Sequence, residues 1–211
     1  MPSVIHSWVR MFAVACALLG VCSTQAAGDA EHGKVLAYTC LGCHGIANYK
    51  NVYPTYNVPE LRGQHPEYLM AALKEYRAKE RAHATMAAQG GSLSDDQIAD
   101  VVAYLAGPEA LKAGPAPIGK APEKVASLCV ACHGLNGIGV TADYPTLAGQ
   151  HEDYLAQALK EYRKGDRKNA VMATFVTTLS DEDVKQIAEY YAAQRPALAT
   201  VPRRTWLYSS K

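Results

Sequence analysis

The sequence contains the same unit twice, and this repeat constrains the fold more than any other feature. Residues 59–106 align with residues 145–192 at a constant offset of 86 without a gap, and 22 of the 48 aligned positions are identical. A Cys-x-x-Cys-His motif precedes each copy, at residues 40–44 and 129–133. Such similarity at a fixed offset excludes coincidence. The chain therefore consists of two tandem copies of one small domain.

Helical patterns recur in both copies, and no segment shows the sustained alternation of a β-strand. Apolar residues follow helical spacing after each motif, and a serine followed by acidic residues marks the start of the next helix. We therefore expect an all-α fold. The predicted helices cover residues 30–38, 67–79 and a segment beginning at Ser94 in the first copy, and residues 122–128, 153–164 and a segment beginning at Ser180 in the second.

The repeat divides the chain into five segments. Residues 28–107 are expected to form the N-terminal domain and residues 121–195 the C-terminal domain. Residues 108–120 contain Pro and Gly and are expected to link the two domains. Residues 1–27 precede the first copy, and residues 196–211 form a basic tail.

The leader has the pattern of a secretory signal peptide. Arg10 precedes an apolar run over residues 11–21, and small residues follow, ending at Ala26 and Ala27. The run is shorter than the roughly 20 apolar residues that span a bilayer. We therefore expect export to the periplasm with cleavage near Ala26 or Ala27. The alternatives, an uncleaved anchor or a lipid on Cys22, would give peripheral membrane association.

All cysteines outside the leader lie in the two Cys-x-x-Cys-His motifs. Of the six cysteines, Cys16 and Cys22 are in the leader, so none is left for a structural disulfide. The motif is the attachment site of c-type haem, in which two thiols form thioethers and the histidine ligates the iron. The predicted cofactors are two covalently bound haem c groups, held by Cys40, Cys43 and His44 and by Cys129, Cys132 and His133.

A redox dithiol and half of a zinc site are the alternative uses of the motif. A thioredoxin-like dithiol does not require the histidine and expects a βαβ setting. A zinc site needs four ligands around one metal, whereas the repeat places each cysteine pair in its own domain. Haem also suits the size of the domains, because a core of about 80 residues is marginal without a cofactor.

Two methionines are the candidates for the second axial ligand of each iron. Met86 lies 42 residues after His44, and Met172 lies 39 residues after His133. The difference equals three additional residues in the loop that follows the first motif. Both methionines are expected in a loop between the second and third helices, and a thioether is a known axial partner of histidine. We therefore predict the iron ligands His44 and Met86 in one domain and His133 and Met172 in the other.

Histidines are the rival ligands. His83 aligns with Asn169, so it is expected to be a surface residue. His65 and His151 align with each other at the start of the second helix and are expected to be capping or surface groups. Bis-histidine ligation is therefore the weaker alternative.

Two aligned prolines, Pro59 and Pro145, are expected beside the ligating histidines. In such domains a proline carbonyl can accept a hydrogen bond from the histidine ring and fix its orientation. The alternative is that both are simple turn prolines.

Charge is nearly balanced, with 21 Lys and Arg against 20 Asp and Glu. A nucleic-acid-binding protein normally has a basic stripe, so this class is not expected. Residues 28–107 carry 7 basic and 9 acidic side chains, and residues 108–195 carry 10 and 11. These balances are too even to identify a docking partner.

The sequence resembles the dihaem cytochrome c4 family, a duplicated class I cytochrome c, over essentially the whole mature chain. The resemblance rests on the two Cys-x-x-Cys-His motifs, each followed by Pro-x-Leu-x-Gly-Gln and a methionine, and on the Leu-Lys-Glu-Tyr-Arg and Leu-Ser-Asp segments. It implies two globular haem domains related by a pseudo-twofold axis, with the haems near their interface. It also implies periplasmic electron transfer, often from a quinol-oxidising complex to a terminal oxidase.

The predicted function is a one-electron shuttle and not an enzyme, because His/Met ligation leaves neither iron an open position. The expected partners are a quinol–cytochrome c reductase and a terminal oxidase, with the chain acting as a monomer. A dihaem peroxidase would need one haem to lose its sixth ligand, yet both copies retain the methionine. A cytochrome subunit of a larger oxidoreductase is a further alternative.

Overall fold

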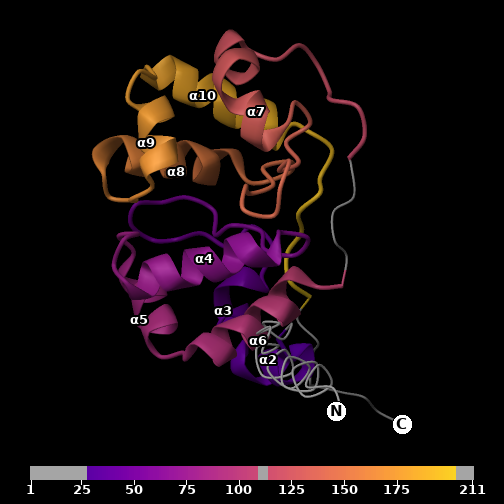
Figure 1. Cartoon of the computed structure of the whole chain (residues 1–211), viewed down its shortest axis with the longest axis vertical. Helices are drawn as coiled ribbons and strands as arrows, with labels where there is room; N and C mark the ends of the chain where they lie inside the picture. The colour runs from indigo at the N-terminus through magenta and orange to yellow at the C-terminus, as the bar shows by residue number, and fades with distance from the viewer. Residues whose placement is uncertain (1–27, 109–113, 203–211) are drawn as a thin grey trace, which may run out of the picture.

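The computed structural model describes residues 28–108 and 114–202 (Figure 1). The predicted signal peptide and the basic residues Arg203 and Arg204 lie outside these ranges. Within them, the regular elements are helices, and the only β-pairing consists of three isolated bridges. The predicted all-α fold is therefore confirmed. None of the described helices is long and apolar enough to cross a membrane.

The first domain is a helical bundle whose first and last helices pack against each other. Its helices are α2 (Ala30–Leu36), α3 (Leu41–His44), α4 (Pro66–Arg77), α5 (Ala84–Gly91) and α6 (Asp95–Ala106). A Cβ atom at Gly33 would lie 1.8 Å from the Asp100 carbonyl oxygen, so glycine is required where α2 crosses α6. Ile98, Val101 and Val102 of α6 are buried in the resulting core.

The second domain repeats this arrangement. Its elements are the π-helical segment η2 (Val125–Cys129) and the helices α7 (Val130–His133), α8 (Glu152–Lys164), α9 (Ala170–Val176) and α10 (Asp181–Ala192). Val184, Ile187 and Tyr191 of α10 are buried in its core. Ser94 and Ser180 cap α6 and α10 as predicted, and each forms a capping box with the third residue of its helix.

The short helix predicted over residues 122–128 is present, although residues 125–129 form the π-helical η2, in which the Val130 N–H donates to the Val125 carbonyl five residues earlier. The predicted setting of the two methionines is wrong. Met86 and Met172 lie in the first turns of α5 and α9 and not in a loop. Both helices are short, so neither contains the long apolar repeat from which a helix can be predicted.

Equivalent residues of the two copies meet across the domain interface. The Gln64 side chain donates to the Thr146 carbonyl and accepts from the Thr146 N–H, at 2.9 Å in each case. The Gln150 side chain makes the corresponding pair of bonds with the Glu60 backbone, at 3.0 and 2.9 Å. Because residues 60 and 64 align with 146 and 150, these bonds show the expected pseudo-twofold relation. Figure 1 shows α4 and α8 on the two sides of this interface, with a loop of the first domain drawn between them.

The last described residues return from the second domain to the first, as the yellow segment of Figure 1 shows. Arg62 and Ala199 exchange backbone hydrogen bonds of 3.0 Å. Val201 is fully buried and belongs to the core of the first domain, and Leu198 is 4% exposed. The beginning of the predicted tail is therefore a structural part of the first domain.

Candidate haem sites

Each domain contains one cavity lined by its motif and its aligned methionine. The first cavity has a volume of about 410 Å³ and the second about 300 Å³. Both are lined mainly by apolar side chains, as a haem site requires. The predicted site residues come together in two sets, Cys40, Cys43, His44 and Met86 around the first cavity and Cys129, Cys132, His133 and Met172 around the second.

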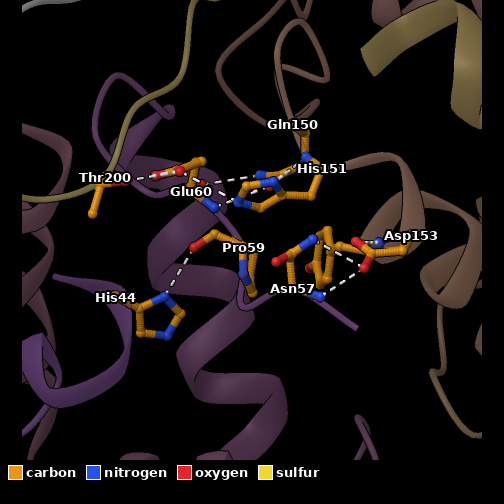
Figure 2. Close-up of polar contacts among 9 residues, drawn as sticks. His44, Asn57, Pro59, Glu60, Gln150, His151, Asp153 and Thr200 are labelled. Atoms are coloured by element: carbon orange, nitrogen blue, oxygen red, sulfur yellow. Dashed lines mark hydrogen bonds and ion pairs between the residues drawn. The ribbon is translucent and has the colours of Figure 1, made fainter. Parts of the chain in front are cut away.

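Each motif histidine is oriented by a proline carbonyl, as predicted. His44 Nδ1 lies 2.9 Å from the Pro59 carbonyl oxygen (Figure 2), and His133 Nδ1 lies 3.0 Å from that of Pro145. The proline carbonyl accepts the proton of Nδ1 and leaves Nε2 available to a metal. Burial lowers the pKa of both imidazoles, although the carbonyls oppose the shift. Burial therefore favours the neutral ring, which is the form that binds a metal.

The methionines are positioned by helix caps that the sequence analysis missed. His83 Nδ1 accepts a hydrogen bond from the Met86 N–H at 3.2 Å, and Asn169 Oδ1 accepts one from the Met172 N–H at 3.0 Å. The prediction that His83 is a surface residue is wrong, because it is half-buried and lines the first cavity. Asparagine is a preferred N-cap, so Asn169 could have indicated that a helix begins just before Met172.

The other two aligned histidines do not line either cavity. His65 and His151 are the N-cap residues of α4 and α8, without a side-chain capping bond. Their position at the start of the second helix is as predicted, but their side chains do not cap it, and both residues are half-buried instead of exposed.

The loop next to the first site is tied to the second domain (Figure 2). The Glu60 carboxylate accepts a hydrogen bond of 2.9 Å from Thr200 Oγ1 and lies 3.3 Å from His151 Nε2. The backbone and side-chain amides of Asn57 both donate to Asp153 at 3.0 Å. The Pro59 carbonyl, which accepts the hydrogen bond from His44, therefore lies between two residues, Asn57 and Glu60, that are bound by side chains from outside their own loop.

A pair of buried arginines lies between the two sites. Arg81 and Arg167 are 5% and 3% exposed and occupy aligned positions of the repeat. Their backbones form an antiparallel bridge across the interface. Arg81 lines both cavities and Arg167 lines the second. The identity of these residues in both copies was visible in the sequence, but their burial depends on tertiary packing.

Comparison with known proteins identifies the family. A family model described as cytochrome c matches residues 30–107 and again residues 121–193. Cytochrome c4 of Pseudomonas aeruginosa is 33% identical over 182 residues, which cover 79% of this chain and 89% of the relative. The chain belongs to the dihaem cytochrome c4 family. It therefore carries two covalently bound haem c groups and transfers electrons.

Solved structures and other relatives agree with this assignment. A crystal structure of reduced cytochrome c4 from Pseudomonas stutzeri has a TM-score of 0.64 and 28% identity, covering 80% of this chain and 100% of that chain. A thiosulfate dehydrogenase electron acceptor of Stutzerimonas stutzeri is 32% identical over 178 residues, covering 74% of this chain and 79% of the relative. A thiosulfate dehydrogenase structure from Marichromatium purpuratum has a TM-score of 0.61 and 28% identity, covering 79% of this chain and 40% of that chain.

Proposed function

We propose that this cytochrome is a periplasmic one-electron shuttle in which both irons are closed by protein ligands. The ligands are His44 and Met86 in the first domain and His133 and Met172 in the second. The observation that carries the proposal is that each aligned methionine lines the same cavity as the motif histidine of its domain. Closed irons bind no substrate, so the protein acts as a carrier and not as an enzyme.

The side chains around each cavity suit this role. The haem supplies one-electron chemistry, and a thioether ligand raises its potential. The proline carbonyls fix the histidine rings, and the caps at His83 and Asn169 fix the helix turns that carry the methionines. A site held from both sides needs little rearrangement when the electron arrives or leaves.

The physiological donor and acceptor belong to the proposal. The two cavities share lining residues at the interface, among them Tyr68 and Tyr154, which supports electron passage from one domain to the other. A quinol–cytochrome c reductase as donor and a terminal oxidase as acceptor would use one domain each. The signal-peptide pattern of residues 1–27 supports a periplasmic location.

A second candidate role is favoured by specific relatives. A thiosulfate dehydrogenase electron acceptor is 32% identical to this chain over 178 residues. The chain would then accept electrons from a partner dehydrogenase as the cytochrome subunit of a larger oxidoreductase. The ligation of the irons would be the same in both roles, so the partner is decided by reduction assays with purified donors.

Substitution of each methionine in turn tests the ligation. The oxidised holoprotein should show the weak near-infrared band of Met–iron ligation with contributions from two haems. Met172→His should remove about half of the band and Met86→His the other half, because each methionine serves one iron. A band that persists at full strength in either variant would show that the methionine is not a ligand.

Carbon monoxide distinguishes the carrier from a peroxidase-type enzyme. The reduced protein should contain two haems per chain and should not bind carbon monoxide readily at neutral pH, since neither iron has an open position. Rapid and complete binding at one haem would support the enzyme, and a stoichiometry of one haem per chain would contradict the two-site arrangement.

A further inference from the structure

Two aligned glutamines, Gln64 and Gln150, each hold one residue of the opposite domain by both of its backbone polar groups. Both side chains are 5% exposed. The Gln64 side chain accepts from the Thr146 N–H and donates to the Thr146 carbonyl. The Gln150 side chain makes the same two bonds with Glu60. Each glutamine therefore fixes backbone that belongs to the other copy of the repeat.

The N–H bound by Gln64 belongs to the amide that orients the second motif histidine. Thr146 follows Pro145, so the Pro145 carbonyl and the Thr146 N–H are two ends of one planar amide. The carbonyl oxygen lies 3.0 Å from His133 Nδ1. The N–H donates to Gln64 Oε1 at 2.9 Å. A chain of two hydrogen bonds therefore runs from His133 through one amide to a glutamine of the first domain.

The first site contains the equivalent chain, which can be followed in Figure 2. The Pro59 carbonyl oxygen lies 2.9 Å from His44 Nδ1. The N–H of the same amide, which belongs to Glu60, donates to Gln150 Oε1 at 2.9 Å. The two chains thus cross the interface in opposite directions, and each ends on a glutamine of the domain that does not contain the histidine.

The glutamine oxygens are held in place from their own domain. Gln64 Oε1 also accepts from the His65 N–H at 3.0 Å, and Gln150 Oε1 from the His151 N–H at 3.1 Å. Both glutamines line the first cavity and neither lines the second. Gln64 is therefore connected to the second site only through the amide that it contacts, and not by its place in the cavity wall.

Hydrogen bonds at the two ends of one amide strengthen each other. When the N–H donates, resonance moves electron density toward the carbonyl oxygen, which becomes a better acceptor. A better acceptor for the Nδ1 proton makes the imidazole a more basic ligand. A more basic ligand stabilises ferric iron relative to ferrous iron and so lowers the potential of the haem.

We propose that Gln64 is a positioning residue for the second haem and Gln150 for the first, each lowering the potential of the haem in the opposite domain. The inference rests on the proposed function, in which His44 and His133 ligate the irons. Each glutamine acts through the amide that follows a proline and not by contact with the haem. The interface therefore contributes to the potentials of both haems.

Gln64→Met gives the sharpest test, because methionine has a similar length and lacks the amide donor and acceptor. The ratio of ferrous to ferric second haem at a fixed potential should rise about threefold, which is about 28 mV at 59 mV per tenfold change for a one-electron couple. The first haem should change less, although Gln64 lines its cavity. Redox titration of the holoprotein, followed by NMR signals assigned to each haem, measures both potentials.

Three results of this titration would overturn the proposal. An unchanged second potential would show that the amide is not polarised by Gln64. A shift confined to the first haem would indicate a local effect of the cavity wall. Equal shifts at both haems would indicate that a loosened interface exposes both to water.

The control is Gln194→Met, which removes a buried glutamine with the same pair of backbone bonds. Gln194 is 2% exposed, accepts from the Ile118 N–H at 2.8 Å and donates to the Ile118 carbonyl at 3.1 Å. Residue 118 also follows a proline, but the motif histidines bond to Pro59 and Pro145. The control should therefore leave both potentials unchanged. A second potential shifted as far as in Gln64→Met would contradict the crossed effect.

Two further variants keep the test informative if Gln64→Met does not fold. Gln64→Glu retains an acceptor for the Thr146 N–H, so the second potential should stay the same or fall. A rise in this variant would have the wrong sign. Gln150→Met should raise the potential of the first haem more than that of the second, and the opposite order would count against the proposal.

The Nδ1 protons report the hydrogen bonds themselves. In NMR spectra of the reduced protein, the His133 Nδ1 proton should move to lower chemical shift in Gln64→Met, because a weaker acceptor deshields it less. A shifted second potential with an unmoved His133 proton would show that Gln64 acts by another route. Failure of the His/Met ligation would appear independently as a missing near-infrared band in the unsubstituted protein, so the two proposals fail in different ways.

Discussion

The two domains share a fold but support the backbone at and just after the motif histidine by different contacts. In the second domain the support is internal: the Tyr190 hydroxyl donates to the Leu135 carbonyl at 2.8 Å, and the Tyr191 hydroxyl to that of Gly134 at 3.2 Å. Both tyrosines lie in α10, the last helix of the same domain. The second site is therefore held by its own bundle.

The first domain lacks this internal support. The residues aligned with the two tyrosines are Tyr104 and Leu105, and the Tyr104 hydroxyl donates no hydrogen bond within the part of the chain that the structure describes. The Val201 N–H instead donates to the His44 carbonyl at 3.2 Å. A segment that follows the second domain thus supports the carbonyl of the first motif histidine itself, one residue before the positions that align with Gly134 and Leu135.

Removal of the C-terminal segment should have the largest effect, because it should destabilise the first domain more than the second. A chain that ends at Arg195 loses the buried side chains of Leu198 and Val201, each worth about 1.5–3 kcal/mol. We expect the free energy of unfolding of the first domain to fall by about 1.5–3 kcal/mol from the loss of Val201 alone, and the second domain to lose less. Hydrogen exchange of α6 and α10 amides, measured by mass spectrometry, reports the two domains separately.

A chain that ends at Pro202 is the control, because it keeps both side chains and the Val201 hydrogen bond. Equal loss of protection in α6 and α10 of the shorter chain would show that the segment does not belong to the first domain alone.

The caps of the methionine helices sharpen the comparison, because different residues perform the same task. Asn169→Ala removes the acceptor of the Met172 N–H and should destabilise α9 by about 1 kcal/mol. His83→Asn should leave the stability of α5 unchanged, since asparagine is the cap used by the second domain, whereas His83→Ala should cost about as much as Asn169→Ala. Exchange of the α5 and α9 amides measures each effect, and a large loss in His83→Asn would argue for a different role of the ring.

Removal of one tyrosine hydroxyl tests the internal support directly. Tyr190→Phe loses the bond to Leu135 and should lower the stability of the second domain by about 0.5–1 kcal/mol. Tyr104→Phe, at the aligned position, removes a hydroxyl with no such bond and should have no measurable effect. Denaturant unfolding of the two holoprotein variants measures both changes in stability. Equal losses of stability in the two variants would show that the Tyr190 hydrogen bond has no special role.

Acidification should produce the smallest change in stability, through one exposed aspartate in each domain. Hydrogen bonds from Arg77 and Lys74 hold the pKa of Asp95 below its ordinary value, whereas Arg163 alone donates to Asp181 and lowers its pKa. A carboxyl whose pKa is lowered by folding stabilises the folded state above its unfolded pKa of about 4, and the stabilisation is lost as pH falls through the folded value.

Both aspartates are exposed, so the contributions are small. Each of the variants Asp95→Asn and Asp181→Asn should therefore show a weaker dependence of stability on pH below about 4. Near neutral pH the slope of stability against pH should be the same as in the unsubstituted protein. Unfolding curves at several acidic pH values measure this dependence. A loss that appears only above neutral pH would have the wrong sign.

The sequence predicted the features that depend on local or repeated patterns. The serine caps at Ser94 and Ser180 and the proline carbonyls at Pro59 and Pro145 lie where expected, because each requires only neighbouring residues or the motif itself. The placement of both methionines beside the motif cavities follows from their alignment across the repeat.

The features that were missed depend on contacts between distant residues. Val201 lies in a segment without a helical or strand pattern, and its burial follows only from the path of the chain back to the first domain. Arg167 is one of several basic residues at a helix end in the sequence, and only the interface makes it a buried charge. His83 was misjudged because its aligned partner differs in type, although both side chains present an acceptor at the same place.

The return of the C-terminal segment also sets an order on assembly. A chain is made from its N-terminus, so domains usually fold in the order of synthesis. Here the residue that closes the first core follows the first motif histidine by 157 positions. The second domain has all of its internal support before that residue emerges. We therefore expect the domain that is made first to be the one that is completed last.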